Sequence, residues 1–589
     1  MGDVHQYRFL RSNSGIFYQS MLEKIMYKKT NPQQTLFDVD SQLSPILRDR
    51  LKSSWAQFFR KEVLPILLRS EDQYAMLYGK TGRPNFSVAR LLGLCLLQEW
   101  NNLSDQQALD TFGFDIRWRY ALDVCDEGDY LSRRSLVEFR RRLVSIDPEM
   151  NLIRSLFDTV RDSALKKLNL SFSNQRLDST HVISNIRIRG RMDLFSNTLR
   201  VFLKSLDKDR FKLVPESVVK WYASEPEGWF GLGPAQQKVK LDQLAHYLYE
   251  LIVLFVKDDD IRNSEPYSLL ERLFHEQCEM PSGKDVVEST GIKLKAKTKG
   301  ETLQSPYDPD ASYGHKGAGY SVHITETCHN PGKPEIITDY EAHGAARSDV
   351  AKMISVLERL ESAGLKPETL FADGGYPSVP SAFKVMEQEI DFMTPVNRGR
   401  VPDDKVGRDS FEFDSDGLVT RCPKGHRPAD HRILSSHNTT RQSLHAVFDG
   451  DICRSCNALD KCPVRAPNHR DQGCLPKDTI GNFRLEITPE LRLRDQMYAI
   501  QQTTEWKDRY SIRSGIEATI SELKRAHGIG RLRVRRAVKI CFAIACKVTA
   551  CNIKRWARAH TGCYGKELQR LLSIFFEYLN ILEVNLNKI

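Results

Sequence analysis

The sequence predicts an α/β domain that is interrupted by two insertions and preceded by an all-helical domain. Three observations support this prediction. Apolar residues recur at helical spacing through residues 41–165, predicted strands alternate with predicted helices between residues 166 and 400, and a group of cysteines lies in residues 401–485. Strands that alternate with helices are typical of a sheet covered by helices. A chain of 589 residues is long enough for roughly two to four domains.

The composition is typical of a water-soluble globular protein, with 41% hydrophobic and 28% charged residues. No stretch approaches the roughly 18 uninterrupted apolar residues of a membrane helix. The N-terminal segment, residues 1–40, begins MGDVHQYRFLRSNSG and lacks the apolar core of a secretory signal. We therefore expect a cytoplasmic protein whose 13 cysteines stay reduced, most of them packed as small hydrophobic residues, as at Cys95.

The helical N-terminal domain is predicted over residues 41–165. The stretch GRPNFSVARLLGLCLLQEWNNLSDQQALDTF starts with a proline and continues with apolar residues at helical spacing. The stretch YLSRRSLVEFRRRLV then predicts an amphipathic basic helix. A helical domain of this kind can bind DNA or form a dimer, and its sequence favours neither role over the other.

The α/β domain starts in residues 166–192, where polar and apolar residues alternate through FSNQRLDSTHVI, a strand pattern. Residues 193–300 return to helical periodicity and end in a polar linker, so we expect a helical insertion there. The domain resumes in residues 301–400. Its predicted elements are strands at 319–328 and 333–344, a helix at 348–364, a strand that ends at Asp373, a helix at 380–390 and a strand at 391–396.

Three acidic residues are candidate metal ligands. Asp178 is expected near the end of one strand, and Asp373 where another strand runs into a Gly-Gly turn. Ligand sites of open α/β sheets lie outside strand ends, although a single aspartate there is more often a turn former or a helix cap. Glu517 lies in a helical pattern. Two aspartates and a glutamate are hard oxygen ligands that can hold one or two Mg²⁺ ions and so support phosphoryl transfer.

The charge distribution predicts a polyanionic partner. The net charge is +10, and Lys and Arg outnumber Asp and Glu between Lys507 and Arg555. Nucleic acid is the commonest partner of such a cluster, and a solvated basic face is the alternative. Glu517 lies inside this cluster, which is consistent with a carboxylate that binds a cation while its neighbours bind phosphates.

A four-residue signature then identifies a family resemblance. Tyr510, Arg513, Glu517 and Lys524 fit the pattern Tyr-x2-Arg-x3-Glu-x6-Lys, and RLDST and FADGGY precede it in order. This combination resembles the DDE transposases of bacterial insertion sequences, whose N-terminal helical domain is similar to the helices predicted above. The resemblance covers nearly all of the chain past about residue 40.

The resemblance implies an RNase H-like catalytic domain, a mixed sheet with flanking helices. Its catalytic and metal-binding triad would be Asp178, Asp373 and Glu517, with Mg²⁺ or Mn²⁺ as cofactor. Arg513 and Lys524 would bind DNA phosphates. Tyr510 would pack beside a displaced base or bond a phosphate, with a packing role inside the protein as the alternative. Residues 510–524 are expected on one helix, since this spacing puts the signature on one side.

The implied activity is binding of the element ends, metal-dependent strand cleavage and strand transfer into target DNA. Double-stranded DNA would be the partner, the chain would associate with the nucleoid through it, and joining two ends requires a homodimer or larger assembly. A nuclease that cuts without joining and a non-catalytic DNA-binding relic are the alternatives. The sequence departs from the family at Gly374, where many relatives carry a polar or charged residue; the role of His181, which follows the first motif, and of the long helical insertion stays open.

The cysteine group predicts a structural zinc site. Its members are Cys422, Cys453, Cys456 and Cys462, with His426 or Cys474 as substitutes for one ligand. Four thiolates can hold Zn²⁺ tetrahedrally, and such sites contribute folding free energy. The alternative is four reduced cysteines in a loop-rich insertion. Residues 486–560 would then carry the glutamate helix and the basic region, and residues 561–589 a C-terminal helix.

Overall fold

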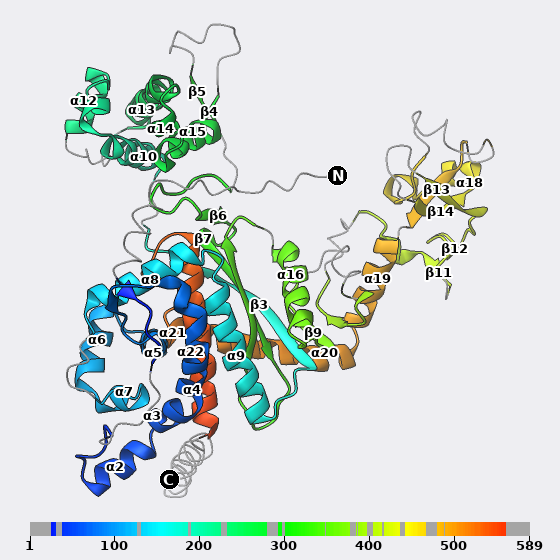
Figure 1. The fold of residues 1–589 in the computed structure, drawn as a ribbon. Coiled ribbons are helices and arrows are strands. Elements are labelled where there is room, and N and C mark those ends of the chain that lie inside the picture. Colours follow the sequence, from blue (N-terminus) through cyan, green and yellow to red (C-terminus); the bar gives the residue numbers. More distant parts are fainter. Residues whose placement is uncertain are drawn as a thin grey trace, which may run out of the picture. The chain divides into compact units, whose positions relative to one another are not determined.

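The structure is a computed structural model (Figure 1). It describes residues 25–30, 38–125, 131–186, 190–224, 233–279, 292–296, 301–347, 349–376, 385, 387–396, 404–414, 417–435, 442–466, 477, 480–487 and 489–560. The chain divides into two compact units, each described by itself below. Unit 1 comprises Met1–Phe172, Asp178–Ser348 and Ile516–Ile589, and unit 2 comprises Ser173–Leu177 and Asp349–Gly515.

The N-terminal part of unit 1 is helical, as the periodicity of its sequence predicts. Serines cap several of these helices: Ser104 forms a capping box with Gln107, and Ser132 accepts a hydrogen bond from the backbone of Ser135. The helices are α2 (Pro45–Lys52), α3 (Trp55–Phe58), α4 (Leu64–Ser70), α5 (Val88–Trp100), α6 (Asp105–Phe114), α7 (Ile116–Ala121), α8 (Arg133–Ile146) and α9 (Asn151–Leu168). Two short helical turns, η1 (Phe59–Val63) and η2 (Glu71–Leu77), and the paired strands β1 (Ile25–Met26) and β2 (Arg83–Pro84) complete this part.

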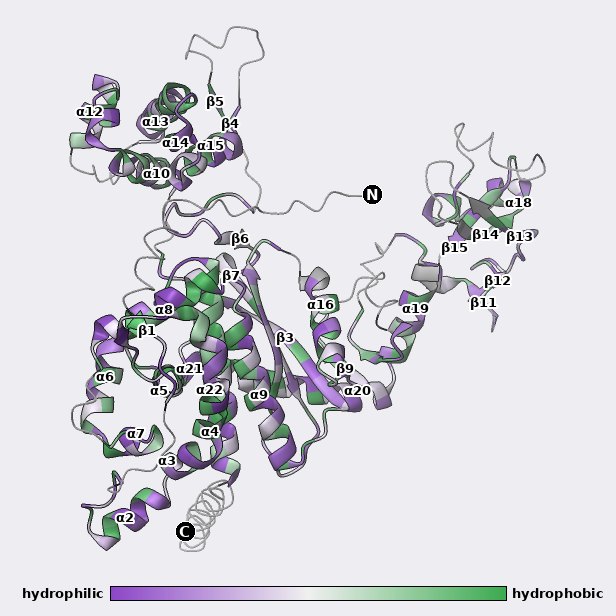
Figure 2. Ribbon diagram, in the orientation of Figure 1, coloured by the Kyte–Doolittle hydropathy of each residue, from purple (hydrophilic) through white to green (hydrophobic). Residues whose placement is uncertain are grey.

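A long helix from the C-terminal part of the chain completes this helical core. Helix α22 (Ala537–His560) contacts α5, α9 and strand β8 of unit 1. Most residues of α5 and of α22 are buried. A helix that is apolar on several sides is stable only when other segments cover those sides. Figure 2 shows hydrophobic residues along α22, yet no described helix is both long and apolar enough to cross a membrane.

Unit 1 also contains an antiparallel layer. Strand β7 (Gly317–Thr327) pairs with β8 (Ile337–Gly344) from Tyr320–Gly344 to Glu326–Ile337, and with the short strand β6 (Ser312–Gly314). Strand β3 (Asn174–Val182) is the other neighbour of β7. The predicted strands at 319–328 and 333–344 therefore exist, and they form a hairpin.

The helical insertion has its own hydrophobic core. Phe202 packs against Phe255 and Tyr267 at ring-centroid distances of 5.6 and 6.2 Å. The insertion contains α10 (Arg191–Ser205), α11 (Lys208–Phe211), α12 (Glu216–Ala223), α13 (Pro234–Phe255), α14 (Asp259–Arg262), α15 (Glu265–Gln277) and the paired strands β4 (Cys278–Glu279) and β5 (Lys293–Leu294). Because these helices bury their apolar faces against one another, the insertion needs little cover from other segments.

Unit 2 is built on parallel strands. The first half of β3 pairs with β9 (Thr369–Ala372), and β9 pairs with β10 (Asp391–Met393), both in parallel register. Helices α16 (Asp349–Ser362) and α19 (Pro489–Gln501) contribute Met353, Leu357 and Leu493 to the core under these strands. The helix predicted at 380–390 lies mostly outside the described residues, as does the one predicted at 561–589.

The cysteine-bearing part of unit 2 is a small β structure. Strands β13 (Asp430–Ser435), β14 (Gln442–Phe448) and β15 (Phe483–Ile487) form an antiparallel sheet, and β11 (Glu412–Phe413) pairs with β12 (Val419–Arg421). Helix α18 (Gly450–Arg454) follows β14. Phe411, Phe448, Leu485 and Ile487 form its core. Taken together, the helices and the mixed strands are compatible with the predicted α/β class.

Candidate functional site

The first two candidate acids follow the same strand pair. Leu177 of β3 is the Cα partner of Ala372 of β9, and this is the last pair in their parallel register. The next residue of the chain is Asp178 after Leu177 and Asp373 after Ala372. The expectation for Asp178 needs a correction, because it is the fifth residue of a nine-residue strand and does not lie near its end. Asp178 instead lies at the point along β3 where the pairing with β9 ends.

The two aspartates differ in exposure. Asp178 is buried, with 8% of its surface exposed, and its Oδ1 accepts a 2.6 Å hydrogen bond from the backbone N–H of Ser179. The side chain of Asp373 is 44% exposed and accepts from the backbone N–H of Gly375. The turn after Asp373 therefore supplies a donor to its carboxylate, which is a local use for the Gly-Gly sequence.

Two signature residues meet Asp373 within unit 2. Arg513 places Nη2 3.6 Å from Asp373 Oδ2. Tyr510 donates from its hydroxyl to the carbonyl oxygen of Ala372 at 3.0 Å, and its ring stacks on Trp506 with centroids 4.6 Å apart. Thr394 donates to the carbonyl oxygen of Asp373 at 3.0 Å. Three side chains, those of Tyr510, Arg513 and Thr394, therefore contact the backbone or carboxylate at the end of β9.

Residues 510–524 do not form one regular helix, contrary to the prediction. Helix α20 (Thr504–Tyr510) ends at the tyrosine, the 3-10 turn η7 (Ser511–Gly515) follows, and α21 (Ile516–Arg525) then begins. Within unit 2, Arg176 donates to the carbonyl oxygen of Ile512 at 2.9 Å. The guanidinium of Arg176 lies directly beside Gly515, where a Cβ would displace it. Packing against β3 therefore overrides helical propensity here.

Glu517 and Lys524 lie on the exposed side of α21. Both are exposed, whereas Ile516, Thr519 and Leu523 are buried. Seven residues correspond to nearly two helical turns, so Glu517 and Lys524 lie on the same side of the helix, as predicted from their spacing. Glu517 thus presents its carboxylate on the solvent side of a helix whose other side is fixed.

The fixed side of α21 is bound by Arg555 of α22. Its Nε donates to Glu522 Oε2 at 2.9 Å, its Nη2 to Thr519 Oγ1 at 2.6 Å, and its Nη1 to Glu326 Oε2 at 3.0 Å. Thr519 also donates to Glu326, which is fully buried in β7. Hydrogen bonds from a charged donor are stronger than neutral ones. No local sequence pattern predicts this network, because Arg555 lies 33 and 36 residues after its α21 partners and Glu326 lies about 200 residues away from all of them.

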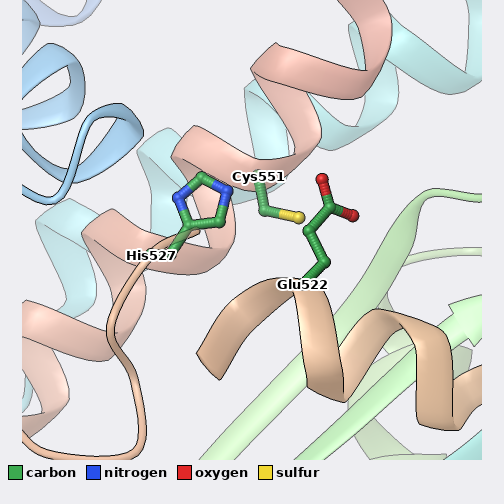
Figure 3. A group of neighbouring side chains, drawn as sticks. All are labelled: Glu522, His527 and Cys551. Carbon is green, nitrogen blue, oxygen red and sulfur yellow. The ribbon is translucent and has the colours of Figure 1, made fainter. Parts of the chain in front are cut away.

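Next to this network lies a group of three potential metal ligands, Glu522, His527 and Cys551 (Figure 3). Their donor atoms lie within 4.8 Å of one another. Burial lowers the pKa of His527 to about 4 and raises that of Cys551 to about 12, so both are neutral near pH 7. The pKa of Glu522 is lowered despite its burial, because Arg555 neutralises it.

Electrostatics argues against a cation in this group. Lys554 and Lys547 act to lower the pKa of His527 and Glu522 acts to raise it, while the carboxylate of Glu522 already accepts a hydrogen bond from Arg555. Asp38, Asp123 and Cys125 form the other such group among the described residues, and there Arg60 bridges the two carboxylates. In both groups an arginine already forms ion pairs with the carboxylates. Neither group contains a member of the predicted triad, of which Asp178 and Glu517 belong to unit 1 and Asp373 to unit 2.

The four predicted zinc ligands line one cavity in unit 2. Cys422, Cys453, Cys456 and Cys462 surround a volume of about 40 Å³ together with His426. Cys422 begins a tight turn in which Gly425 donates to its carbonyl oxygen and its own N–H donates to His426, each at 2.8 Å. Burial and the other thiols raise the pKa of Cys453 to about 11, so the thiol of Cys453 is neutral near pH 7 without a metal. The substitute ligand Cys474 lies outside the described residues.

Two family models match the chain. Residues 421–557 match the transposase DDE domain, and residues 59–142 match a transposase domain (DUF772). The first match spans the four cysteines and Glu517, while Asp178 and Asp373 lie before it. No curated protein and no solved structure matches the chain.

The two matches identify a transposase class whose DDE domain implies phosphodiester cleavage and DNA binding. Together the matches support a DDE transposase of insertion-sequence type. The DUF772 match covers α5, α6, α7 and most of α8, and the DDE-domain match runs from the end of β12 into α22.

Proposed function

We propose that this transposase binds the ends of its own mobile element and catalyses metal-dependent strand cleavage and strand transfer. The observation that carries the proposal is the β3–β9 register, in which Asp178 and Asp373 each follow the last paired residue. A carboxylate that directly follows the paired part of a parallel strand is suited to bind a cation. Glu517, exposed on α21, is the third acid of the proposed triad.

Each residue has a proposed task. Asp178, Asp373 and Glu517 would hold Mg²⁺ or Mn²⁺, which when bound activates a nucleophile and stabilises the leaving oxygen. Arg513 neutralises Asp373 in this structure, and a guanidinium at that position is also suited to a phosphate. Lys524 would bind a phosphate from the same side of α21 as Glu517. Tyr510 already donates to the end of β9, which supports a role in holding Asp373 more than contact with a base.

The first test is strand cleavage and joining on DNA from both flanks of the gene, with Mg²⁺ or Mn²⁺. Glu517→Gln should lower cleavage at least about 100-fold while DNA binding persists, because it removes one metal ligand and leaves the basic residues intact. Asp178→Ala should do the same. The matched control is Glu505→Gln on α20, an exposed acid outside the triad, which should cleave normally.

The outcomes separate the candidate activities. Cleavage with joining by the wild type, lost in both triad variants, supports the transposase mechanism. Cleavage without joining would favour a nuclease, and binding without cleavage would favour a non-catalytic DNA-binding protein. Full metal-dependent cleavage by Glu517→Gln would remove this residue from the triad.

We also propose that Cys422, Cys453, Cys456 and Cys462 bind one structural Zn²⁺. The support is their position around one cavity, together with the tight Cys422 turn, which is suited to a thiolate ligand. Zinc analysis of the purified chain should find about one Zn²⁺ per chain, and Cys453→Ser should lose it. Cys541→Ser, in α22, is the control that should keep the metal. A zinc-free wild type that resists proteolysis in residues 401–485 would exclude the site.

A further inference from the structure

A tight hairpin of unit 1 presents two basic residues at its tip. Gly314 of β6 pairs with Gly317 of β7, so the loop between them consists of only His315 and Lys316. Gly317 has φ +114°, a conformation that favours glycine in such short hairpins. Both tip residues are exposed. A two-residue loop has little freedom, so the position of Lys316 is largely fixed by the strands.

The hairpin is held against neighbouring segments of unit 1. A Cβ at Gly314 would overlap the carbonyl oxygen of Ala345, and one at Gly319 would overlap that of Val182 at the end of β3. A Cβ at Gly317 would lie 3.8 Å from Nε2 of His181. Glycines at these positions therefore allow the hairpin to lie directly beside β3.

The segments that carry Lys316 and Lys524 both lie beside residues 181–183. The pKa of His181 is lowered by burial first, and then by the positive charges of Lys316 and Lys524. Lys524 lies on α21, 208 residues after Lys316 in the sequence, and its Cγ is 3.6 Å from the position of a Cβ at Gly530. Gly530 in turn accepts a 3.0 Å hydrogen bond from the N–H of Ile183, two residues after His181.

A third basic side chain belongs to the same segment. Arg531 forms a parallel β-bridge with Ile183, directly after Gly530, and it is exposed. Within the described parts of the chain, no ion pair is recorded for Lys316, Lys524 or Arg531, although other exposed basic residues such as Arg536 and Arg509 do pair with acids. Basic side chains on one surface that form no ion pair with an acid gain free energy when an anion binds.

We propose that Lys316, Lys524 and Arg531 form one phosphate-binding strip that holds the DNA backbone beside Glu517. This inference rests on the proposed function and deepens it, because it adds two residues outside the four-residue signature to the DNA-binding surface. The strip contacts phosphates and no base edges, so it contributes to affinity without sequence preference. Its position on α21 and beside β3 means that the same elements that carry Glu517 and Asp178 also hold the substrate.

The test is DNA binding by the full-length chain as a function of salt. Lys316→Ala should weaken binding of a 30-base-pair duplex about 3- to 10-fold at 100 mM KCl and lower the slope of log K against log salt by about one. The loss should be equal for flank DNA and for a scrambled duplex. Arg531→Ala should weaken binding and lower the slope by similar amounts. Lys316→Arg should show the wild-type slope, because it keeps the positive charge.

Lys166→Ala is the matched control. Lys166 is an exposed lysine in the last turn of α9. The cap of this helix, Asn169, accepts a hydrogen bond from Lys333, which follows the C-terminal end of β7, whereas Lys316 precedes its N-terminal end. This variant should bind DNA with the wild-type slope. Circular dichroism melting of all variants should match the wild type, since no recorded ion pair is removed.

Two results distinguish failure of the strip from failure of the proposed function. If the wild type cuts element ends but Lys316→Ala keeps the wild-type salt slope, the phosphate-binding strip is wrong and the catalytic proposal stands. If the wild type cuts no DNA with Mg²⁺ or Mn²⁺ but Lys316→Ala has a reduced salt slope, the strip is supported and the catalytic proposal is wrong.

Discussion

Two arginines of this protein face carboxylates in opposite ways. In unit 1, Arg555 is buried and bonded to Glu326, Glu522 and Thr519, so its donors and their acceptors are satisfied. In unit 2, Nη2 of Arg513 lies 3.6 Å from Oδ2 of Asp373, and that side chain is 44% exposed. The first pairing is a closed structural core. The second leaves carboxylate oxygen atoms open to solvent, which is what a metal ligand requires.

The largest effect that sharpens this comparison is expected at Arg555. Arg555→Met should lower the free energy of unfolding by about 3–5 kcal/mol, because it leaves the buried carboxylate of Glu326 and the partly buried one of Glu522 without their guanidinium partner. Urea unfolding followed by circular dichroism measures the change. Adding Glu326→Gln and Glu522→Gln to the variant should recover part of the loss. A decrease below about 1 kcal/mol would mean that the network is not closed as described.

A smaller effect is expected from His527, which lies beside the Arg555 network. Its folded pKa of about 4 lies below the ordinary value of a histidine, so the unfolded chain binds the proton more readily. The stability that neutral His527 contributes is full above about pH 6.5 and is lost as the pH falls toward 4. Wild type should therefore lose about 2–3 kcal/mol more than His527→Gln between pH 7 and pH 4.5.

The control for this pH effect is His275→Gln, which alters an exposed histidine of α15. Its stability should follow the wild-type pH profile. If His527→Gln follows that profile too, the pKa of His527 is the same in the folded and the unfolded chain, and the lowering by burial described above would be wrong.

The smallest change in stability is expected at Arg513. Arg513→Met should alter the free energy of unfolding by less than about 1 kcal/mol, since an ion pair with a half-exposed partner is screened by water. Its cleavage activity should nevertheless fall, because the proposed phosphate and Asp373 contacts are lost. A stability loss as large as that of Arg555→Met would make the two regions equivalent and would contradict the open site proposed at Asp373.

Local sequence patterns predicted much of the secondary structure. Alternation through FSNQRLDSTHVI predicted β3, and helical periodicity predicted α5 and the helices of the insertion, because these signals depend only on neighbouring residues. The same patterns failed at residues 510–524, where the 3-10 turn η7 separates two helices. Arg176 of β3 occupies the space beside Gly515, and no helical pattern encodes that contact.

The sequence by itself determined which residues carry candidate chemistry: the three acids, the signature around Glu517 and the four cysteines. Tertiary structure alone decided how they are supported. It brought Glu326 of β7 and Arg555 of α22 together across 229 residues, and it bonded Ile183, which follows β3, to Gly530, which precedes Arg531. The reason is physical, because spacing along a helix or strand is fixed by backbone geometry, while contacts between distant segments depend on how all buried faces pack at once.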